Sequence, residues 1–207
     1  MERPFGGRRT LVDTSAYARI AAVPQIRQTW ERGVAEGLVY LATPTYVEIL
    51  DSARNGDTYT AMAEELDALP AAPVDEQIFE LAVAAHARLA SVSPSFHRNF
   101  SMPDLLVAAA AHRYEIGVWH YDRDFDHIRE HTALEYDSIW AAPPGSIGAP
   151  TRRTPQRAAR SSLSRAVAAL PPGEVVPTVD ELLEIVERRL RDHGVEPPGR
   201  VPSEPIA

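Results

Sequence analysis

Hydrophobic residues along the first 140 positions fall into two kinds of block. Short apolar runs of strand length occupy residues 8–12, 38–42, 71–74, 117–121 and 134–140. Longer blocks, in which apolar residues recur at helical spacing, run from 24 to 37, 43 to 55, 57 to 69, 75 to 89 and 102 to 116. A short helix is expected around Phe125–Arg129. Strands that alternate with helices predict an α/β/α sandwich with a mainly parallel central sheet.

Polar residues suited to begin helices precede several of these blocks. Either Thr14 or Ser15 is expected to cap a short helix after the first strand, and Thr43 to cap the helix that has Pro44 in its first turn. Asp75 is expected to cap the helix that follows it.

The composition changes after residue 142, which predicts a domain at 1–142 and an extension at 143–207. The extension begins with a Pro/Gly-rich linker, continues into an arginine-rich stretch at 151–165, and ends in a predicted amphipathic helix at 178–193. Three interpretations of the extension remain open. The extension is either a structural appendage, or an inhibitory arm that reaches an acidic groove, or a segment that contacts RNA phosphate.

The residue types that are missing exclude several chemistries. The chain has no cysteine, which removes disulfides, thiol catalysis and cysteine-based zinc sites. All 21 basic residues are arginine, and without lysine there is no P-loop, Schiff-base or protein-kinase chemistry. The absence of a signal-peptide pattern and of any apolar run of membrane-spanning length predicts a soluble cytoplasmic protein.

The net charge of −8 is carried by the predicted domain. Residues 143–207 are close to neutral, with nine arginines and eight acids, whereas residues 1–142 hold twelve arginines and twenty-one acids. An acidic body argues against a broad basic surface for nucleic acid, but it is compatible with a nuclease whose bound cations offset the acids.

Four acidic residues lie inside or beside apolar runs, where unpaired acids are uncommon. These residues are Asp13, Glu48, Asp104 and Asp122. Asp13 and Asp122 follow strands, and the carboxyl ends of parallel strands form the usual site of such sheets. Convergent carboxylates suit Mg²⁺ or Mn²⁺, which can orient a phosphodiester and activate water.

Each acid also has a purely structural interpretation. Asp13 suits a helix cap, Glu48 a boundary facing water, Asp104 the helix dipole, and Asp122, Asp124 and Asp126 a solvated acidic loop. His127 and His131 are four residues apart, but with Arg129 between them they are expected to face solvent rather than bind metal. A haloacid-dehalogenase-type phosphatase is set aside because Ser15 stands where that chemistry needs a second acid.

Four segments together resemble one known family. They are Leu11-Val-Asp13-Thr-Ser15, Thr45-Tyr-Val-Glu48, Pro103-Asp104-Leu-Leu-Val-Ala-Ala-Ala and Tyr121-Asp122-Arg-Asp124-Phe125. In this order and spacing they are similar to the PIN-domain ribonucleases, and most of all to the VapC-type toxins of toxin–antitoxin pairs. The resemblance covers residues 9–140.

The resemblance implies a PIN-like fold and a role for each matching residue. Asp13, Glu48, Asp104 and Asp122 would hold Mg²⁺ or Mn²⁺, with Asp124 as an additional or alternative fourth acid, and Ser15 would support the first acid by hydrogen bonding. The implied activity is RNA cleavage by a homodimer that a cognate antitoxin inhibits. Arg19, Arg54, Arg98, Arg113 and Arg123 are candidates to position the RNA.

Two features depart from the family pattern. His120 stands where the family often has Thr or Ser, which either alters the arrangement around the fourth acid or gives the metal site a titratable neighbour. The chain also continues well past residue 140, where such toxins usually stop. The alternative function is a catalytically inactive PIN-fold module that binds another protein.

Overall fold

The computed structural model describes residues 3–147, in which a five-stranded sheet lies between two layers of helices. The strands are β1 (Thr10–Val12), β2 (Val39–Ala42), β3 (Ala71–Ala72), β4 (Gly117–His120) and β5 (Ser138–Trp140). The α-helices are α1 (Thr14–Tyr17), α2 (Pro24–Ala35), α3 (Thr43–Asp51), α4 (Gly56–Leu66), α5 (Glu76–Ala90), α6 (Met102–Tyr114) and α7 (Asp124–His131). Two 3₁₀ turns, η1 (Pro4–Gly7) and η2 (Phe96–Asn99), complete the described chain.

All neighbouring strands of the sheet run parallel, in the order β3-β2-β1-β4-β5. From β1 the chain builds outward through β2 to β3, then returns to the other side of β1 with β4. The strand order therefore reverses between β1 and β4, which is where open α/β sheets form their binding crevice. Val12 pairs with Trp119, so these two strands end side by side.

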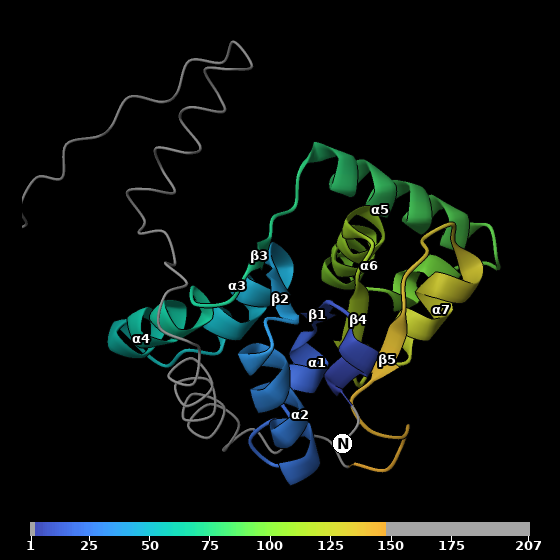
Figure 1. The fold of residues 1–207 in the computed structure, drawn as a ribbon. Helices are drawn as coiled ribbons and strands as arrows, with labels where there is room; N and C mark the ends of the chain where they lie inside the picture. The colour runs from blue at the N-terminus through green and yellow to red at the C-terminus, as the bar shows by residue number, and fades with distance from the viewer. Residues whose placement is uncertain (1–2, 148–207) are drawn as a thin grey trace, which may run out of the picture. The chain divides into compact units, whose positions relative to one another are not determined.

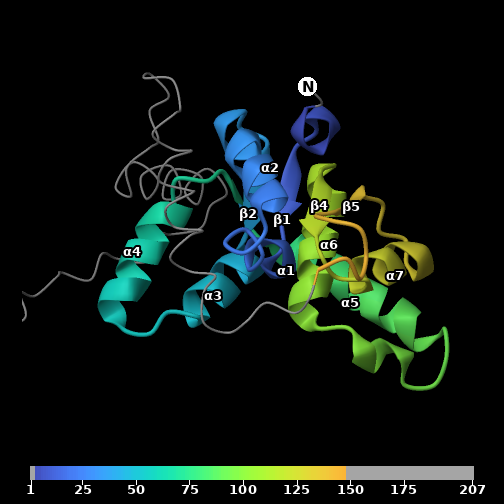
Figure 2. The ribbon, with the colours of Figure 1, turned by 90° about the horizontal axis from the view of Figure 1, so that it is seen from below.

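Alternate residues of the central strands point into two separate cores, as the two-residue repeat of a strand requires. Leu11 and Val118 pack with buried residues of α5, α6 and α7. Val12 and Trp119 pack with buried residues of α1, α2, α3 and α4. In Figure 1, α5 and α6 lie on one side of the strands and α2 on the other, and Figure 2 shows the arrangement from below. The predicted α/β/α sandwich is confirmed.

The starts of two helices differ from the prediction. Asp13 itself caps α1 by accepting the Ser15 backbone N–H at 2.8 Å, so neither Thr14 nor Ser15 is the cap. Ala42 precedes α3 without any side-chain cap, which puts Thr43 inside the helix. Asp75 caps α5 as expected, through the backbone N–H of Ile78.

The proposed extension falls almost entirely outside the described residues. This applies to the arginine-rich stretch at 151–165 and to the expected helix at 178–193. The domain boundary at 142 therefore stays a prediction. Among the helices of residues 3–147, none has both the length and the apolar character needed to cross a membrane.

Candidate metal centre

Asp13 lies at the carboxyl end of the central strand β1, where the strand order reverses. Its side chain is only 5% exposed and receives both the backbone N–H and the hydroxyl of Ser15. The Ser15 hydroxyl oxygen in turn accepts the backbone N–H of Tyr121 at 2.9 Å. The expected support of Asp13 by Ser15 is therefore present, and it also fastens the end of β1 to the segment that follows β4. Burial raises the pKa of Asp13, the hydrogen bonds from Ser15 oppose this rise, and the charge of Glu48 adds to it.

Glu48 is half-buried on α3 and turns toward the end of β1 rather than only toward water. Its Oε2 accepts the hydroxyl of Thr14 at 2.6 Å, across 34 positions of sequence. Because Thr14 follows Asp13 directly, this bond fixes the second acid beside the first.

Asp104 occupies the first turn of α6. This helix runs opposite to the parallel strands, so its first turn lies at their carboxyl ends. The Ser101 hydroxyl donates to Asp104 Oδ2 at 2.7 Å, and its oxygen accepts the Asp104 backbone N–H at 3.1 Å. Burial is the main reason that the pKa of Asp104 rises to about 7, and the Ser101 hydrogen bond lowers it. The charges of Asp13, Asp122 and Glu48 raise it further. The charges of the other three predicted acids thus act on Asp104.

The fourth acid has two candidates, Asp122 and Asp124, on the turn between β4 and α7. Asp122 Oδ1 accepts the backbone N–H of Asp124 at 3.0 Å. Burial and the neighbouring Asp122 raise the pKa of Asp124, while His127 lowers it. Asp122, and not Asp124, is among the charges that raise the pKa of Asp104. This favours Asp122 as the fourth member of the group.

His120 is fully buried behind Asp122 and belongs to a chain of hydrogen bonds that the sequence did not indicate. Its Nδ1 accepts the Asp122 backbone N–H at 3.2 Å, and its Nε2 lies 2.7 Å from the Ser138 hydroxyl oxygen. Ser138 donates to Asp126, which also accepts the indole N–H of Trp140 at 2.9 Å. Asp126 is therefore not a solvated loop residue, as its structural interpretation expected, but the far end of a network that holds the Asp122 backbone.

The same contacts settle the protonation of His120. An acceptor role for Nδ1 leaves the proton on Nε2, so the ring is neutral. Burial lowers the pKa of His120 to about 4, against opposing effects of Asp126 and Asp122. His120 was expected either to alter the arrangement around the fourth acid or to titrate beside the candidate metal site. A neutral ring with a lowered pKa does not support titration near neutral pH.

The lowered pKa predicts how acid affects stability. Between about pH 6.5 and pH 4 the unfolded chain protonates His120 and the folded chain does not, so the wild type should lose stability from this residue as the pH falls. The His120→Asn variant should lack this loss, which amounts to about 3 kcal/mol over the window. Urea unfolding of both proteins at pH 7 and pH 4.5 measures the difference. An identical pH dependence in the two proteins would contradict a buried neutral imidazole.

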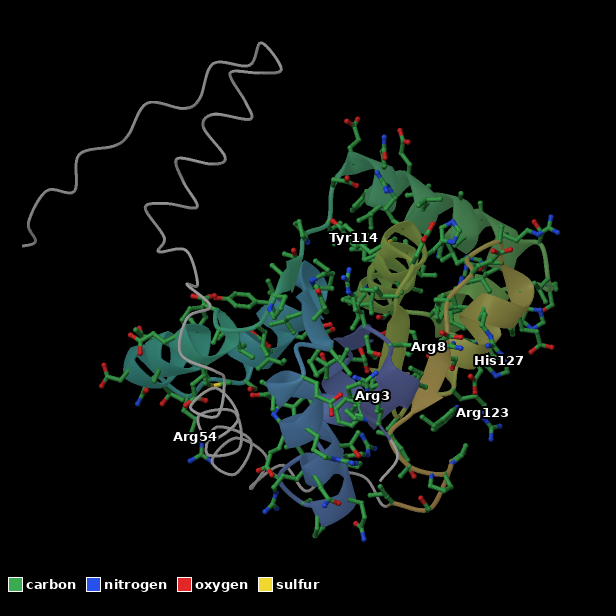
Figure 3. All side chains as sticks on the ribbon, viewed as in Figure 1. Arg3, Arg8, Arg54, Tyr114, Arg123 and His127 are labelled. Carbon is green, nitrogen blue, oxygen red and sulfur yellow. The ribbon has the colours of Figure 1, made fainter. Side chains whose placement is uncertain are left out.

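Of the five candidate arginines, Arg19 is the one on which the charges of Asp13 and Asp122 are seen to act. The Arg19 guanidinium carbon is 4.2 Å from the centre of the Tyr121 ring, and its Nη1 donates to the Ser15 carbonyl at 2.5 Å. Arg54 and Arg123 project from opposite sides of the molecule in Figure 3. Arg98 and Arg113 are exposed, and Arg113 lies at the end of α6 remote from Asp104.

The four carboxylates share one region but are not drawn tightly together. Within residues 3–147, the only three acid or histidine side chains whose ligand atoms all lie within 4.8 Å of one another are His127, Glu130 and His131. The two histidines, expected to face solvent, have 39% and 30% of their side chains exposed, and each has a ring nitrogen 3.9 Å from Glu130 Oε2.

A family model and individual known proteins match the same part of this chain and point to the same family. The PIN domain family model matches residues 10–131. Ribonuclease VapC18 of Mycobacterium tuberculosis is 34% identical over 136 residues, which are 66% of this chain and 97% of that protein. Ribonuclease VapC2 of the same species is 31% identical over 140 residues, which are 67% and 97% of the two chains. Ribonuclease VapC11, also of that species, is 33% identical over 62% of this chain and 98% of its own length.

These matches cover nearly the whole of each relative and leave about a third of this chain outside them. The family model, at residues 10–131, matches the sandwich that carries the acids. This chain is also longer than these relatives, as expected from the sequence. Together with the parallel sheet and its reversal between β1 and β4, the matches show that the chain belongs to the PIN-domain family, among its VapC-type ribonucleases.

Proposed function

We propose that this chain is a metal-dependent endoribonuclease that hydrolyses phosphodiester bonds in RNA, and that it is the toxin of a toxin–antitoxin pair. The observation that carries the proposal is the placement of four acids from four separate segments. Thr14 donates a hydrogen bond to Glu48 beside Asp13, and Ser15 joins Asp13 to the turn after β4 that holds Asp122. The charges of Asp13, Asp122 and Glu48 also act on Asp104. The VapC relatives, which are named as ribonucleases, support the same reaction.

The residues fit a hard divalent cation. All four donors are carboxylates, which is the ligand type that Mg²⁺ and Mn²⁺ prefer. Burial is the main cause of the pKa of about 7 for Asp104, and the charges of Asp13, Asp122 and Glu48 add to it, so a bound cation would favour the charged form of this side chain. We assign Asp13, Glu48, Asp104 and Asp122 as the ligands. When bound, the cation would orient the phosphodiester, activate a water molecule and offset charge on the leaving oxygen.

Residues around the acids fix their orientation. Thr14, Ser15 and Ser101 each donate a hydrogen bond to one carboxylate, so the oxygens are oriented before substrate arrives. His120 holds the backbone N–H of Asp122 through Nδ1. Asp124 then lies in an outer position, where its backbone N–H donates to Asp122.

Arg19 is the residue best placed to contact the RNA backbone. It lies over Tyr121, next to Asp122 and Asp13, and an arginine at the edge of a metal site can pair with a phosphate oxygen that the cation also contacts. The remaining four candidate arginines have no comparable position and are assigned to the surface.

The proposal includes the partners and the location. An RNA substrate and a cognate antitoxin that covers the acidic pocket follow from the VapC type, and a cytoplasmic location fits both. A homodimer is supported by exposed apolar side chains on α5. Phe79 and Val83 lie one turn apart there, and each is 50% exposed.

Cleavage of end-labelled RNA by the full chain tests the proposal. We expect internal cuts with Mn²⁺ or Mg²⁺ and none with EDTA. Glu48→Gln should lower the cleavage rate by about 10- to 100-fold, because it removes one charged ligand and retains its size. Glu64→Gln, a matched change at an exposed position of α4, should not.

The rival function predicts a different result. If RNA stays intact with either cation while the chain still binds a protein partner tightly, the inactive interaction module is the better description. Equal cleavage rates for Glu48→Gln and the wild type would remove Glu48 from the ligand set.

A further inference from the structure

Three side chains at the end of α7 lie closer together than the acids of the predicted centre. His127 Nδ1 and His131 Nε2 are each 3.9 Å from Glu130 Oε2. All three atoms fall within 4.8 Å of one another, as no other such group in residues 3–147 does. The two histidines are one helical turn apart, which puts them on the same face of α7.

The environment of these side chains leaves a nitrogen without a partner. His127 Nδ1 is buried from water and has no hydrogen-bond partner within the described structure. A buried polar atom in that condition lowers stability unless something binds to it. The expected ion-pair partner, Glu130, stays 3.9 Å away, beyond hydrogen-bonding distance.

Phe96 of η2 holds both rings in place. Its ring meets His131 edge-on, with centroids 5.3 Å apart, and His127 at 6.4 Å. The two imidazole rings are nearly parallel, at 14°. Figure 3 shows where His127 lies on α7. Because an aromatic side chain from another segment packs on them, the rings are positioned by the fold rather than free to rotate in solvent.

The ligand types select a class of cation. Two imidazole nitrogens and one carboxylate suit Zn²⁺ and neighbouring transition metals, whereas Mg²⁺ prefers oxygen ligands alone. At Zn–N distances of about 2.0–2.1 Å, tetrahedral ligand atoms lie about 3.3 Å apart, so small side-chain rotations suffice. A zinc-binding helix can carry two histidine ligands in this His-x-x-Glu-His pattern, which residues 127–131 match. In that pattern the glutamate is not a ligand, so the support for Glu130 is its position beside both imidazoles.

We propose that His127, Glu130 and His131 form a second metal site, which binds a transition-metal cation of the Zn²⁺ class and is separate from the carboxylate centre. The cation would link successive turns of an eight-residue helix whose first turn contains Asp124 and Asp126. It would thereby stabilise the helix that anchors the hydrogen-bond network behind Asp122.

Titration of the tag-free full chain with Co²⁺ tests the site without reference to nuclease activity. Co²⁺ absorbs strongly in the visible range when four- or five-coordinate with nitrogen ligands, and weakly in an octahedral oxygen site. We expect one equivalent to give an intense band that Zn²⁺ abolishes and excess Mg²⁺ does not. Free Zn²⁺ at about 100 times its Kd should lower the unfolding equilibrium constant by about 100-fold.

Matched variants locate the ion. His127→Gln and His131→Gln should each abolish the band and weaken Zn²⁺ binding by more than about 100-fold, since losing even an outer partner of a metal ligand costs 10- to 100-fold. His86→Gln, which changes a histidine outside the group, should keep the band. The double variant Asp13→Asn/Asp104→Asn should keep it too, because only the carboxylate centre is changed.

Several results would overturn the site. These are the absence of an intense band in the wild type, a band that survives both histidine substitutions, and a band lost in the Asp13→Asn/Asp104→Asn protein. Circular dichroism of the metal-free variants excludes misfolding as the cause of a loss. Glu130→Gln leaves both imidazoles intact and should weaken Zn²⁺ binding by about 10-fold, whereas unchanged binding would contradict the carboxylate ligand.

Discussion

The Asp13→Asn variant is expected to lose RNA cleavage by at least about 10³-fold in Mn²⁺ while remaining folded. Asp13 lies where the strand order reverses, and its exposed fraction is only 5%. The substitution removes the charge but keeps the size and one acceptor oxygen for the Ser15 N–H, which caps α1. A 10³-fold loss corresponds to about 4 kcal/mol of transition-state stabilisation, which is reasonable for a central charged ligand of a cation.

Single-turnover cleavage of a labelled RNA measures this loss. Asp51→Asn, at the exposed end of α3, makes the same chemical change outside the acidic region and should leave the rate within about 2-fold, as expected for a surface substitution. If Asp13→Asn cuts as fast as Asp51→Asn, the carboxylate group is not the active centre. A matching loss in both would point to instability rather than to metal binding.

The sequence was informative wherever a candidate site residue coincides with a regular pattern. The strand before Asp13 and the strand before Asp122 were recognisable as apolar runs, and parallel topology brings their ends to one edge of the sheet. Asp104 was recognisable because it lies near the start of an apolar block of helical spacing at 102–116. For these positions, local pattern and topology together determine location, so no knowledge of side-chain contacts was required.

Contacts between separate segments were not visible in the sequence. The bond from Thr14 to Glu48 joins residues 34 positions apart, and the one from Ser138 to Asp126 depends on how α7 packs against β5. The cap of α1 could not be chosen from the sequence for a related reason. Asp13, Thr14 and Ser15 are all suitable caps and each was a candidate, and the fold selects Asp13. The four-residue spacing of His127 and His131 was visible in the sequence, but the packing of Phe96 on both rings was not, because Phe96 is distant in sequence.

Asp104 adds a conflict between stability and function that only the structure reveals. Burial and three neighbouring acids raise its pKa from 3.8 to about 7. Between these values the folded chain binds a proton that the unfolded chain has released, so this residue lowers stability as the pH rises from about 4 to 7, and the loss persists above pH 7. His120 contributes in the opposite direction between about pH 6.5 and pH 4. The two effects partly cancel in the wild type and are best separated by variants.

Without metal, Asp104→Asn should therefore be more stable than the wild type at pH 8. The pKa rise corresponds to about 4 kcal/mol, which partial solvent exposure of the side chain reduces to about 1–2 kcal/mol. The helix dipole favours an anion in the first turn of α6 by only about 0.3–1 kcal/mol, which is too little to reverse the sign. Urea unfolding in EDTA at pH 8 and pH 4 measures the difference, which should shrink at the lower pH.

Asp57→Asn provides the matched control, because Asp57 is an exposed acid in the first turn of α4. Asp57→Asn removes only the favourable interaction of an exposed carboxylate with the helix dipole, and should destabilise the protein by about a few tenths of a kcal/mol. Saturating Mn²⁺ should reverse the order of the wild type and Asp104→Asn, since the cation replaces repulsion among the acids by attraction and the variant has one ligand fewer. Lower stability of Asp104→Asn in EDTA would mean that burial and the neighbouring acids together do not disfavour a charged Asp104 in the folded chain. The case for a cation among them would then lose its electrostatic basis.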